Sequence, residues 1–260
     1  MFGWWRSWKR KRILQTPATR EERELALQGA WQWNRTPPQV FEEALKWMRI
    51  FLQETNFEGC GGHALTVEDK WMVASQAALM TVAYPDFYFD HIGSILIYPY
   101  SYVAKGKIQD VGSGVSLHGE SYREGEAWYR GPVILNWHEV KRAKQDDNEG
   151  HHLVVHEFAH QMDMWNDPQA DGVPPLPSHV DSDLWKRRLE GEWKEASRVV
   201  SSGYSILLNE YSLVSMAEFF AVSSEYYFQL PGELAHYHPG VFELLLDFYR
   251  VDWRKWLVDR

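Results

Sequence analysis

The stretch VVHEFAHQMD, residues 154 to 163, constrains this chain more than any other part of the sequence. It places His156 and His160 four residues apart, with Glu157 directly after the first histidine. On an α-helix the two imidazoles lie about 40° apart, and Asp163 lies about 20° away on the same face. The opposite face is apolar, with Val154, Val155, Phe158, Met162 and Trp165. The pattern predicts a helix that buries one flank and presents its imidazoles from the other.

This spacing suits a catalytic metal ion. Two imidazoles one helical turn apart reach a single zinc ion, and Glu157, rotated by about 100°, contacts a metal-bound water instead. Zinc lowers the pKa of that water, and the glutamate takes its proton as the water attacks a carbonyl carbon. We therefore expect one Zn²⁺ per chain, bound by His156 and His160, with Glu157 as the general base. The alternative is a helix that carries two histidines by chance.

Other polar residues flank the pattern. Asp163 is expected to orient one of the two histidines through a hydrogen bond, although a plain solvated aspartate is the alternative. His151 and His152 are interpreted as polar residues of the first helical turn. The pair His152 and His156 lacks the glutamate, because Leu153 follows His152.

A catalytic zinc ion needs a third protein ligand, and residues 209–228 contain two candidates. Glu218 is one candidate. Ser215 lies three residues before it, so the alternative is that Glu218 only completes a capping box at the start of a helix. Glu225 lies two turns further along the same face, about 10 Å away, so both glutamates cannot bind one ion. Periodicity alone does not choose between them.

Composition limits the class of protein. The chain has 260 residues, 45% of them hydrophobic and 14 of them Trp, which is enough apolar material for a packed core. A formal net charge of −9 argues against a nucleic-acid partner. Cys60 is the only cysteine, which favours a reducing cytoplasm. No apolar run reaches the roughly 18 residues of a membrane span, so no transmembrane segment is expected.

The order of predicted elements is helices, a small sheet, then helices, which indicates an α+β fold that is mainly helical. Residues 20–54 read as helices interrupted by Pro37 and Pro38, and Thr66 with Asp69 opens another helix. Further helices are expected at about 137–143, 149–165, 182–201, 215–229 and 239–257.

Residues 94–103 and 131–137 read as strands. Pro99 indicates an edge or a bulge in the first strand. The second strand precedes the helix that carries the His-Glu-x-x-His (HExxH) pattern of residues 156–160, and as an edge strand it could pair with an extended substrate. We expect a basic aromatic tail over 1–19 and one domain over 20–260, with a helical part (20–92) and a catalytic part (93–260).

Several segments together resemble a known family. GHHLVVHEFAHQMD, MAEFFAVSSEYYF, GCGG, SILIYPYSYV and GEAWYRGPVILNW look like the Mlc titration factor A family of zinc metallopeptidases, from about residue 10 to the C-terminus. The resemblance implies His156, His160 and Glu218 as zinc ligands, Glu157 as the base, and Tyr211 as an assisting residue. It also implies a zincin-like catalytic core similar to that of anthrax lethal factor. Met216 stands where the family often has proline.

The expected function is a cytoplasmic zinc peptidase acting on a peptide or protein, with aminopeptidase as the narrower expectation. The resemblance also implies a link to the regulation of sugar uptake through a transcription regulator of the Mlc type. One alternative is a non-catalytic protein that sequesters such a regulator, and another is a non-peptidase zinc hydrolase. Glu157 and Tyr211 favour the enzyme, because a structural zinc site needs neither.

Overall fold

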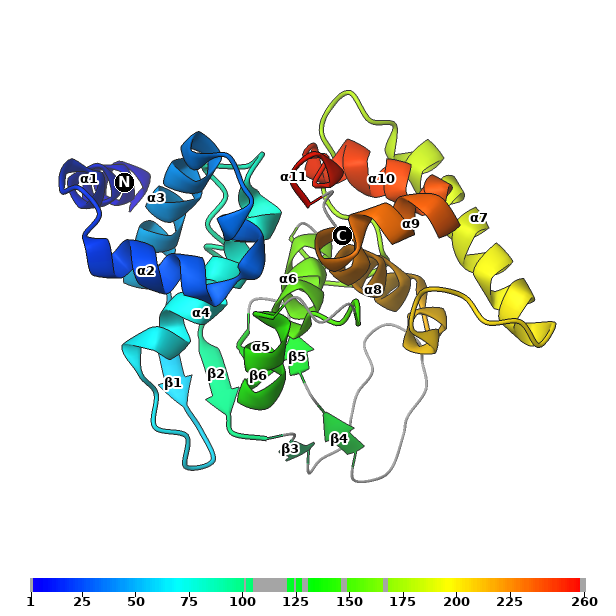
Figure 1. Ribbon diagram of the computed structural model, residues 1–260, viewed down its shortest axis with the longest axis horizontal. Helices are drawn as coiled ribbons and strands as arrows, with labels where there is room; N and C mark the ends of the chain where they lie inside the picture. The colour runs from blue at the N-terminus through cyan, green and yellow to red at the C-terminus, as the bar shows by residue number, and fades with distance from the viewer. Residues whose placement is uncertain are drawn as a thin grey trace.

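The computed structural model describes residues 2–100, 102–104, 121–123, 125–127, 131–145, 149–165 and 168–257. Most of these residues are helical, and the described strands form a four-stranded and a two-stranded sheet (Figure 1). The predicted fold class, α+β and mainly helical, is confirmed. The glycines at 106, 112, 114 and 119, which punctuate the sequence between the predicted strands, lie outside the described residues.

The N-terminal helices begin where the sequence places caps. Thr19 caps α2 and Thr66 caps α4, each in a reciprocal capping box with the acidic residue three positions later. Pro38 begins α3, a position where proline's missing N–H costs no hydrogen bond. The elements of this part are α1 (Phe2–Gln15), α2 (Arg20–Gly29), the 3-10 turn η1 (Trp31–Asn34), α3 (Pro38–Glu54), α4 (Val67–Ala78) and the 3-10 turn η2 (Leu79–Thr81).

The segment expected as a basic aromatic tail over 1–19 contains a helix, α1. Arg10 of α1 donates to Glu54 at the end of α3 over 2.6 Å and to Asp90 over 2.7 Å. The Arg10 guanidinium is also stacked on the ring of Tyr88, 4.1 Å from its centroid. These contacts attach α1 to the helical part of the chain.

The main sheet has the order β1-β2-β6-β5. Its strands are β1 (Phe57–Gly59), β2 (Ile95–Tyr98), β6 (Val133–Asn136) and β5 (Gly125–Ala127). The first three are parallel, and β5 runs antiparallel to β6. A separate antiparallel pair consists of β3 (Tyr102–Ala104) and β4 (Ser121–Arg123).

The sequence suggested an edge or a bulge for the first predicted strand and an edge for the second, but both are inner strands, so the edge prediction was wrong for each. β2 lies between β1 and β6, and Pro99 follows its last residue instead of interrupting it. β6 lies between β2 and β5, so its backbone is already paired on both sides. The reason is that β1 and β5 are only three residues long, too short for a recognisable alternating pattern.

Helices form the rest of the chain: α5 (Trp137–Ala143), α6 (Leu153–Asp163), α7 (Ser182–Ser201), the 3-10 turn η3 (Glu210–Leu213), α8 (Met216–Gln229), α9 (Pro231–Tyr237), α10 (Pro239–Tyr249) and α11 (Arg254–Leu257). The helix expected over 239–257 is two helices, because Arg250 adopts a left-handed backbone with φ of 60° and ends α10. Within the described parts of the chain, we find no helix long and apolar enough to cross a membrane.

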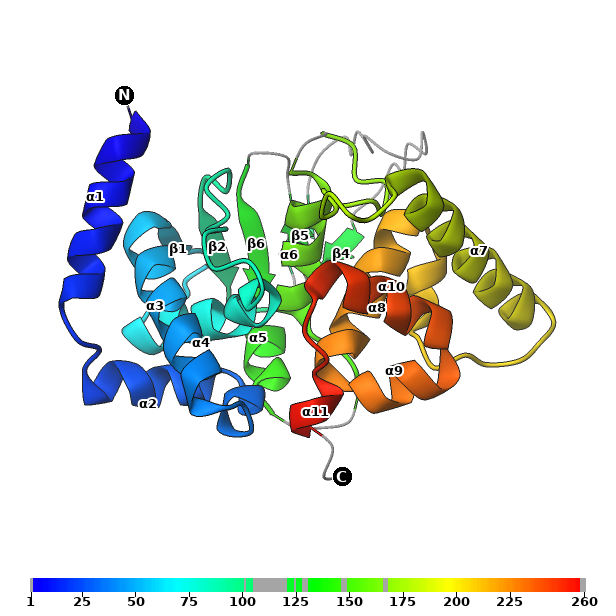
Figure 2. The ribbon, with the colours of Figure 1, turned by 90° about the horizontal axis from the view of Figure 1, so that it is seen from above.

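The HExxH helix α6 lies in the middle of the molecule, between the sheet and the C-terminal helices (Figure 2). Phe158 is fully buried and packs edge-on against the rings of Phe51 and Phe89. The imidazole face of α6 is covered as well, because α8 packs against it. The helix is therefore buried on both flanks, whereas its sequence pattern predicted one.

Candidate metal centre

The local sequence determines where α6 begins. Gly150 has φ of 73°, and a Cβ there would lie 2.5 Å from the ring of Tyr226, so glycine is required at this close approach. His152 is the N-cap residue, and its Nδ1 accepts a hydrogen bond from the Val155 amide over 3.3 Å. Burial lowers the pKa of His152 to about 4, which keeps this cap neutral. His151 and His152 thus precede the helix, and His156 lies in its first turns.

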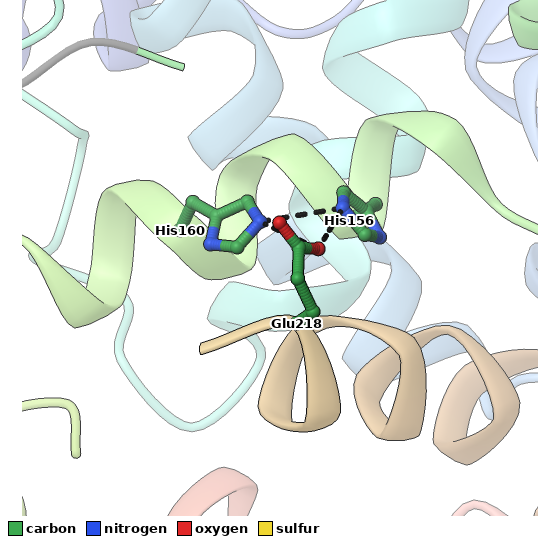
Figure 3. Close-up of side chains that lie close together, drawn as sticks. All are labelled: His156, His160 and Glu218. Carbon is green, nitrogen blue, oxygen red and sulfur yellow. Dashed lines mark hydrogen bonds and ion pairs between the residues drawn. The ribbon is translucent and has the colours of Figure 1, made fainter. Parts of the chain in front are cut away.

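Three side-chain atoms from α6 and α8 converge on one point (Figure 3). The Nε2 atoms of His156 and His160 lie 3.3 Å apart. The Oε2 atom of Glu218 lies 3.1 Å from the first and 3.4 Å from the second. Glu218 reaches this point because Ser215 caps α8 and places Glu218 in its first turn, beside α6.

The size of this triangle matches that of a tetrahedral metal site. Zinc bonds to nitrogen and oxygen of about 2.0–2.1 Å separate neighbouring tetrahedral ligands by about 3.3–3.4 Å. The three separations, 3.1, 3.3 and 3.4 Å, agree with that edge length. Two imidazole nitrogens and a carboxylate oxygen with lone pairs turned toward each other also need a cation or a proton between them. The residues present therefore fit a zinc ion.

Glu225 lies on the other side of His156. Its Oε1 lies 2.8 Å from Nδ1 of His156, and its Oε2 lies 2.8 Å from Nδ1 of His151. The same Oε2 accepts the backbone N–H of His152 over 2.5 Å. A carboxylate at Nδ1 selects the tautomer with its proton there and leaves a lone pair on Nε2, toward Glu218 and His160.

The imidazoles and carboxylates of the centre shift one another's pKa values. Burial would raise the pKa of Glu218, but the imidazoles of His156 and His160 hold it well below its ordinary value. Burial likewise opposes ionisation of Glu225, and His151 and His156 outweigh it, so its pKa is also lowered. Burial lowers the pKa of His156. The carboxylates of Glu218 and Glu225 raise it by more than burial lowers it, so the pKa lies above the ordinary value. The two carboxylates therefore stay ionised and stabilise a positive charge next to them.

Glu157 and Tyr211 border the centre. Glu157 is 4% exposed, and its charge acts on His156. Tyr211 lies in η3, and its hydroxyl donates to Oε1 of Glu218 over 3.3 Å. The Tyr211 ring is half exposed and lies 6.1 Å from the imidazole of His156, centroid to centroid. Tyr211 thus stands at the open side of the centre.

Asp163 is placed differently from its expected position against a histidine. Its Oδ2 accepts the backbone N–H of Gly172 over 2.8 Å, which attaches the loop after α6 to the end of that helix. Burial raises the pKa of Asp163 to about 7, and the hydrogen bond from Gly172 opposes this shift. Glu225 contacts the ring of His156 in its place.

Sequence reasoning treated Glu225 only as a competitor of Glu218 for the metal. The signal that could have identified its position is the seven-residue spacing, which places both glutamates on the face of α8 turned toward α6. One then reaches Nε2 of His156 and the other reaches Nδ1 of the same ring.

Similarity to known proteins identifies the family of this chain. An uncharacterized protein of Synechocystis sp. is 27% identical over 249 residues, which span 95% of this chain and 90% of that protein. Mlc titration factor A of Yersinia pestis and that of Yersinia pseudotuberculosis are each 32% identical over 205 residues, 77% of this chain and 74% of theirs. The family model described as glucose-regulated metallo-peptidase M90 matches residues 5–250. The resemblance found in the sequence is confirmed, and the chain belongs to the glucose-regulated metallo-peptidase M90 family.

Proposed function

We propose that this protein is a zinc-dependent peptidase whose metal is held by His156, His160 and Glu218. The observation that carries the proposal is the triangle of Nε2, Nε2 and Oε2 atoms with sides of 3.1–3.4 Å. Membership of a metallopeptidase family implies a metal cofactor. The choice of zinc rests on the donor set, since two imidazoles and one carboxylate with an open fourth position are typical of catalytic zinc.

When bound, zinc supplies Lewis acidity, which polarises a carbonyl group and makes a water molecule acidic near neutral pH. The chain's own residues do the rest. Glu157 takes the proton of the attacking water and later gives it to the leaving amine. Glu225 holds Nδ1–H of His156, so that Nε2 keeps its lone pair for the metal. Tyr211 turns its hydroxyl from Glu218 toward the oxygen on which negative charge develops.

A peptide is the substrate that best fits the sheet. β5 is the edge of the main sheet among the described residues, and it contacts α6. An extended peptide could add to the free side of β5 by backbone hydrogen bonds, which is a common mode of peptide binding. We therefore assign peptide pairing to β5 and not to residues 131–137, because β6 is already paired on both sides. Removal of residues from the amino end is the narrower activity that we propose.

The printed name of the Yersinia relatives, Mlc titration factor A, supports a second partner. We propose that the chain also binds a transcription regulator of the Mlc type, which would link it to the control of sugar uptake. The single cysteine, Cys60, fits a reducing compartment such as the cytoplasm. A non-catalytic binding protein would share this partner and would not need Glu157.

The peptidase proposal is tested by metal analysis together with a peptide-library digest of the purified chain. We expect about one zinc ion per chain, cleavage that a chelator stops, and recovery of cleavage when zinc is added back. Zinc binding without cleavage of any library peptide would instead favour the non-catalytic binding protein.

The assignment of Glu218 as the third ligand, with Glu225 acting through His156, gives a direct comparison. Glu218→Gln removes a charged ligand, whereas Glu225→Gln weakens only the contact that orients a ligand. Loss of such an orienting contact typically lowers metal affinity by about 10- to 100-fold. We expect a larger drop for Glu218→Gln, measured by competition with a chromogenic zinc chelator. A larger drop for Glu225→Gln would reverse the assignment.

Tyr211→Phe is expected to keep zinc and the fold while lowering kcat by roughly 10²- to 10³-fold, the scale for one lost oxyanion donor. The change keeps the ring and removes only the hydroxyl. Steady-state kinetics on a cleaved library peptide, with zinc content measured in parallel, checks this prediction. Tyr204→Phe, another exposed tyrosine, is the matched control. Wild-type kcat in Tyr211→Phe would leave Tyr211 without a catalytic role.

A further inference from the structure

Glu225 of α8 carries a negative charge in the interior of the protein, next to the metal centre. Its side chain is only 4% exposed. Oε1 lies 2.8 Å from Nδ1 of His156, and Oε2 lies 2.8 Å from Nδ1 of His151. A buried carboxylate stays ionised only when a nearby cation and hydrogen bonds compensate its charge. The histidines around Glu225 therefore determine how its charge is balanced.

Two of these histidines are neutral once a metal ion is bound. His152 is neutral because its Nδ1 accepts the Val155 amide and burial lowers its pKa to about 4. His156 is neutral as a metal ligand, because its Nε2 must be free of a proton to bind the ion. Among the described residues, no lysine or arginine forms an ion pair with Glu225. Within that part of the chain, His151 is the side chain left to balance Glu225.

The position of His151 favours its charged form. Its Nδ1 faces Glu225, and its Nε2 lies 3.7 Å from Oε2 of Glu139 on α5. Carboxylate oxygens only accept hydrogen bonds, so an imidazole between two of them is stabilised with a proton on both nitrogens. In agreement, His151 helps to hold the pKa of Glu225 below its ordinary value. Arg142 lies 3.6 Å from the same oxygen of Glu139, but its side chain is 43% exposed, so water screens its charge.

We propose that His151 is the counter-cation of Glu225 and that its charge lowers the affinity of the metal centre for zinc. This inference rests on the metal site proposed above. His151 acts on the site through Glu225, so it is a positioning residue and not a ligand. Its positive charge offsets one of the negative charges that attract a divalent ion. Removal of that charge should therefore strengthen zinc binding.

The geometry of Glu225 does not depend on His151 alone. The backbone N–H of His152 also donates to Oε2 of Glu225, over 2.5 Å. A neutral residue at position 151 should thus leave Oε1 of Glu225 against His156. This second contact separates the effect of charge from that of orientation, because loss of an orienting contact to a ligand weakens metal binding instead.

His151→Gln keeps an N–H donor at this position and removes the charge. We expect this variant to bind zinc about tenfold more tightly than the wild-type chain, the scale for one charge several Å from an ion in a partly buried site. Competition with a chromogenic zinc chelator, on the metal-free full chain at constant pH near neutrality, measures the affinity without any hydrolysis. His151→Asn, a shorter neutral amide, serves if His151→Gln does not fold.

His151→Lys keeps a positive charge and should bind zinc with about the wild-type affinity. If the imidazole had only a structural role, the neutral and the charged variants would both bind zinc more weakly. His63→Gln is the matched control, because His63 also pairs with a buried carboxylate, Asp69, over 2.9 Å. It should leave zinc affinity unchanged.

Zinc binding in His151→Gln that is equal to or weaker than in the wild type would overturn the proposal, and so would tighter binding in His151→Lys as well. The metal site itself is judged by the wild-type chain. If that chain binds no zinc, the metal site is rejected together with this inference. If it binds zinc and only the effect of His151→Gln is missing, the metal site stands and this inference is rejected.

Discussion

Glu157→Gln is expected to lose nearly all peptide hydrolysis while zinc remains bound. An amide cannot take the proton of the attacking water, and general-base catalysis of this kind contributes up to about 10⁴-fold in rate. The two side chains have nearly the same size, so the buried position next to His156 should be kept. Turnover of a cleaved library peptide and zinc content, measured on the same preparation, check both parts of the prediction.

Glu192→Gln is the matched control, because Glu192 is a partly buried glutamate on α7 away from the converging atoms. It should hydrolyse peptide at the wild-type rate. If Glu157→Gln loses its zinc instead, Glu157 is a ligand and the arrangement proposed here is wrong. If it keeps both zinc and activity, another group is the base.

His156→Ala or His160→Ala is expected to abolish stable zinc binding, because either change leaves two of three protein ligands. Metal analysis after dialysis should find about one zinc ion per wild-type chain and almost none in these variants. The fold should survive, since a continuous hydrophobic core runs from the N-terminal helices through the sheet to α10. Circular dichroism of the metal-free variants checks that the helices remain.

His236→Ala, a change at an exposed histidine of α9, is the control and should keep full zinc content. Full occupancy in both His156→Ala and His160→Ala would place the metal elsewhere. Loss of the helical signal in the metal-free wild type would mean that zinc is needed for folding, as it is in small zinc domains.

Local signals in the sequence predicted much of the structure. The bounds of α5 and α7 match the predicted ranges, 137–143 and 182–201, and Asn136 and Asp181 cap the starts of these helices with side-chain oxygens. The Thr66 capping box likewise determined the start of α4. These features depend on residues only two or three positions apart, so they can be read from the sequence.

The predicted element positions that differ from the structure depend on contacts with distant parts of the chain. β1 exists because residues 57–59 pair with 95–97, and neither segment signals the pairing alone. The helix predicted from about 149 begins at Leu153, because the turn at Gly150 packs against Tyr226 of α8. Residues 131–137 were predicted as an edge strand, but β5 covers the free side of β6.

The sequence by itself determined the chemistry available to this protein: two imidazoles and a glutamate on one helix, with further glutamates on a second. Only the tertiary structure decided how those groups are used. Glu218 and Glu225 are indistinguishable by period, yet the packing of α8 on α6 turns one toward Nε2 of His156 and the other toward Nδ1. Side-chain period is a property of one helix, whereas the atoms that meet are set by how two helices pack.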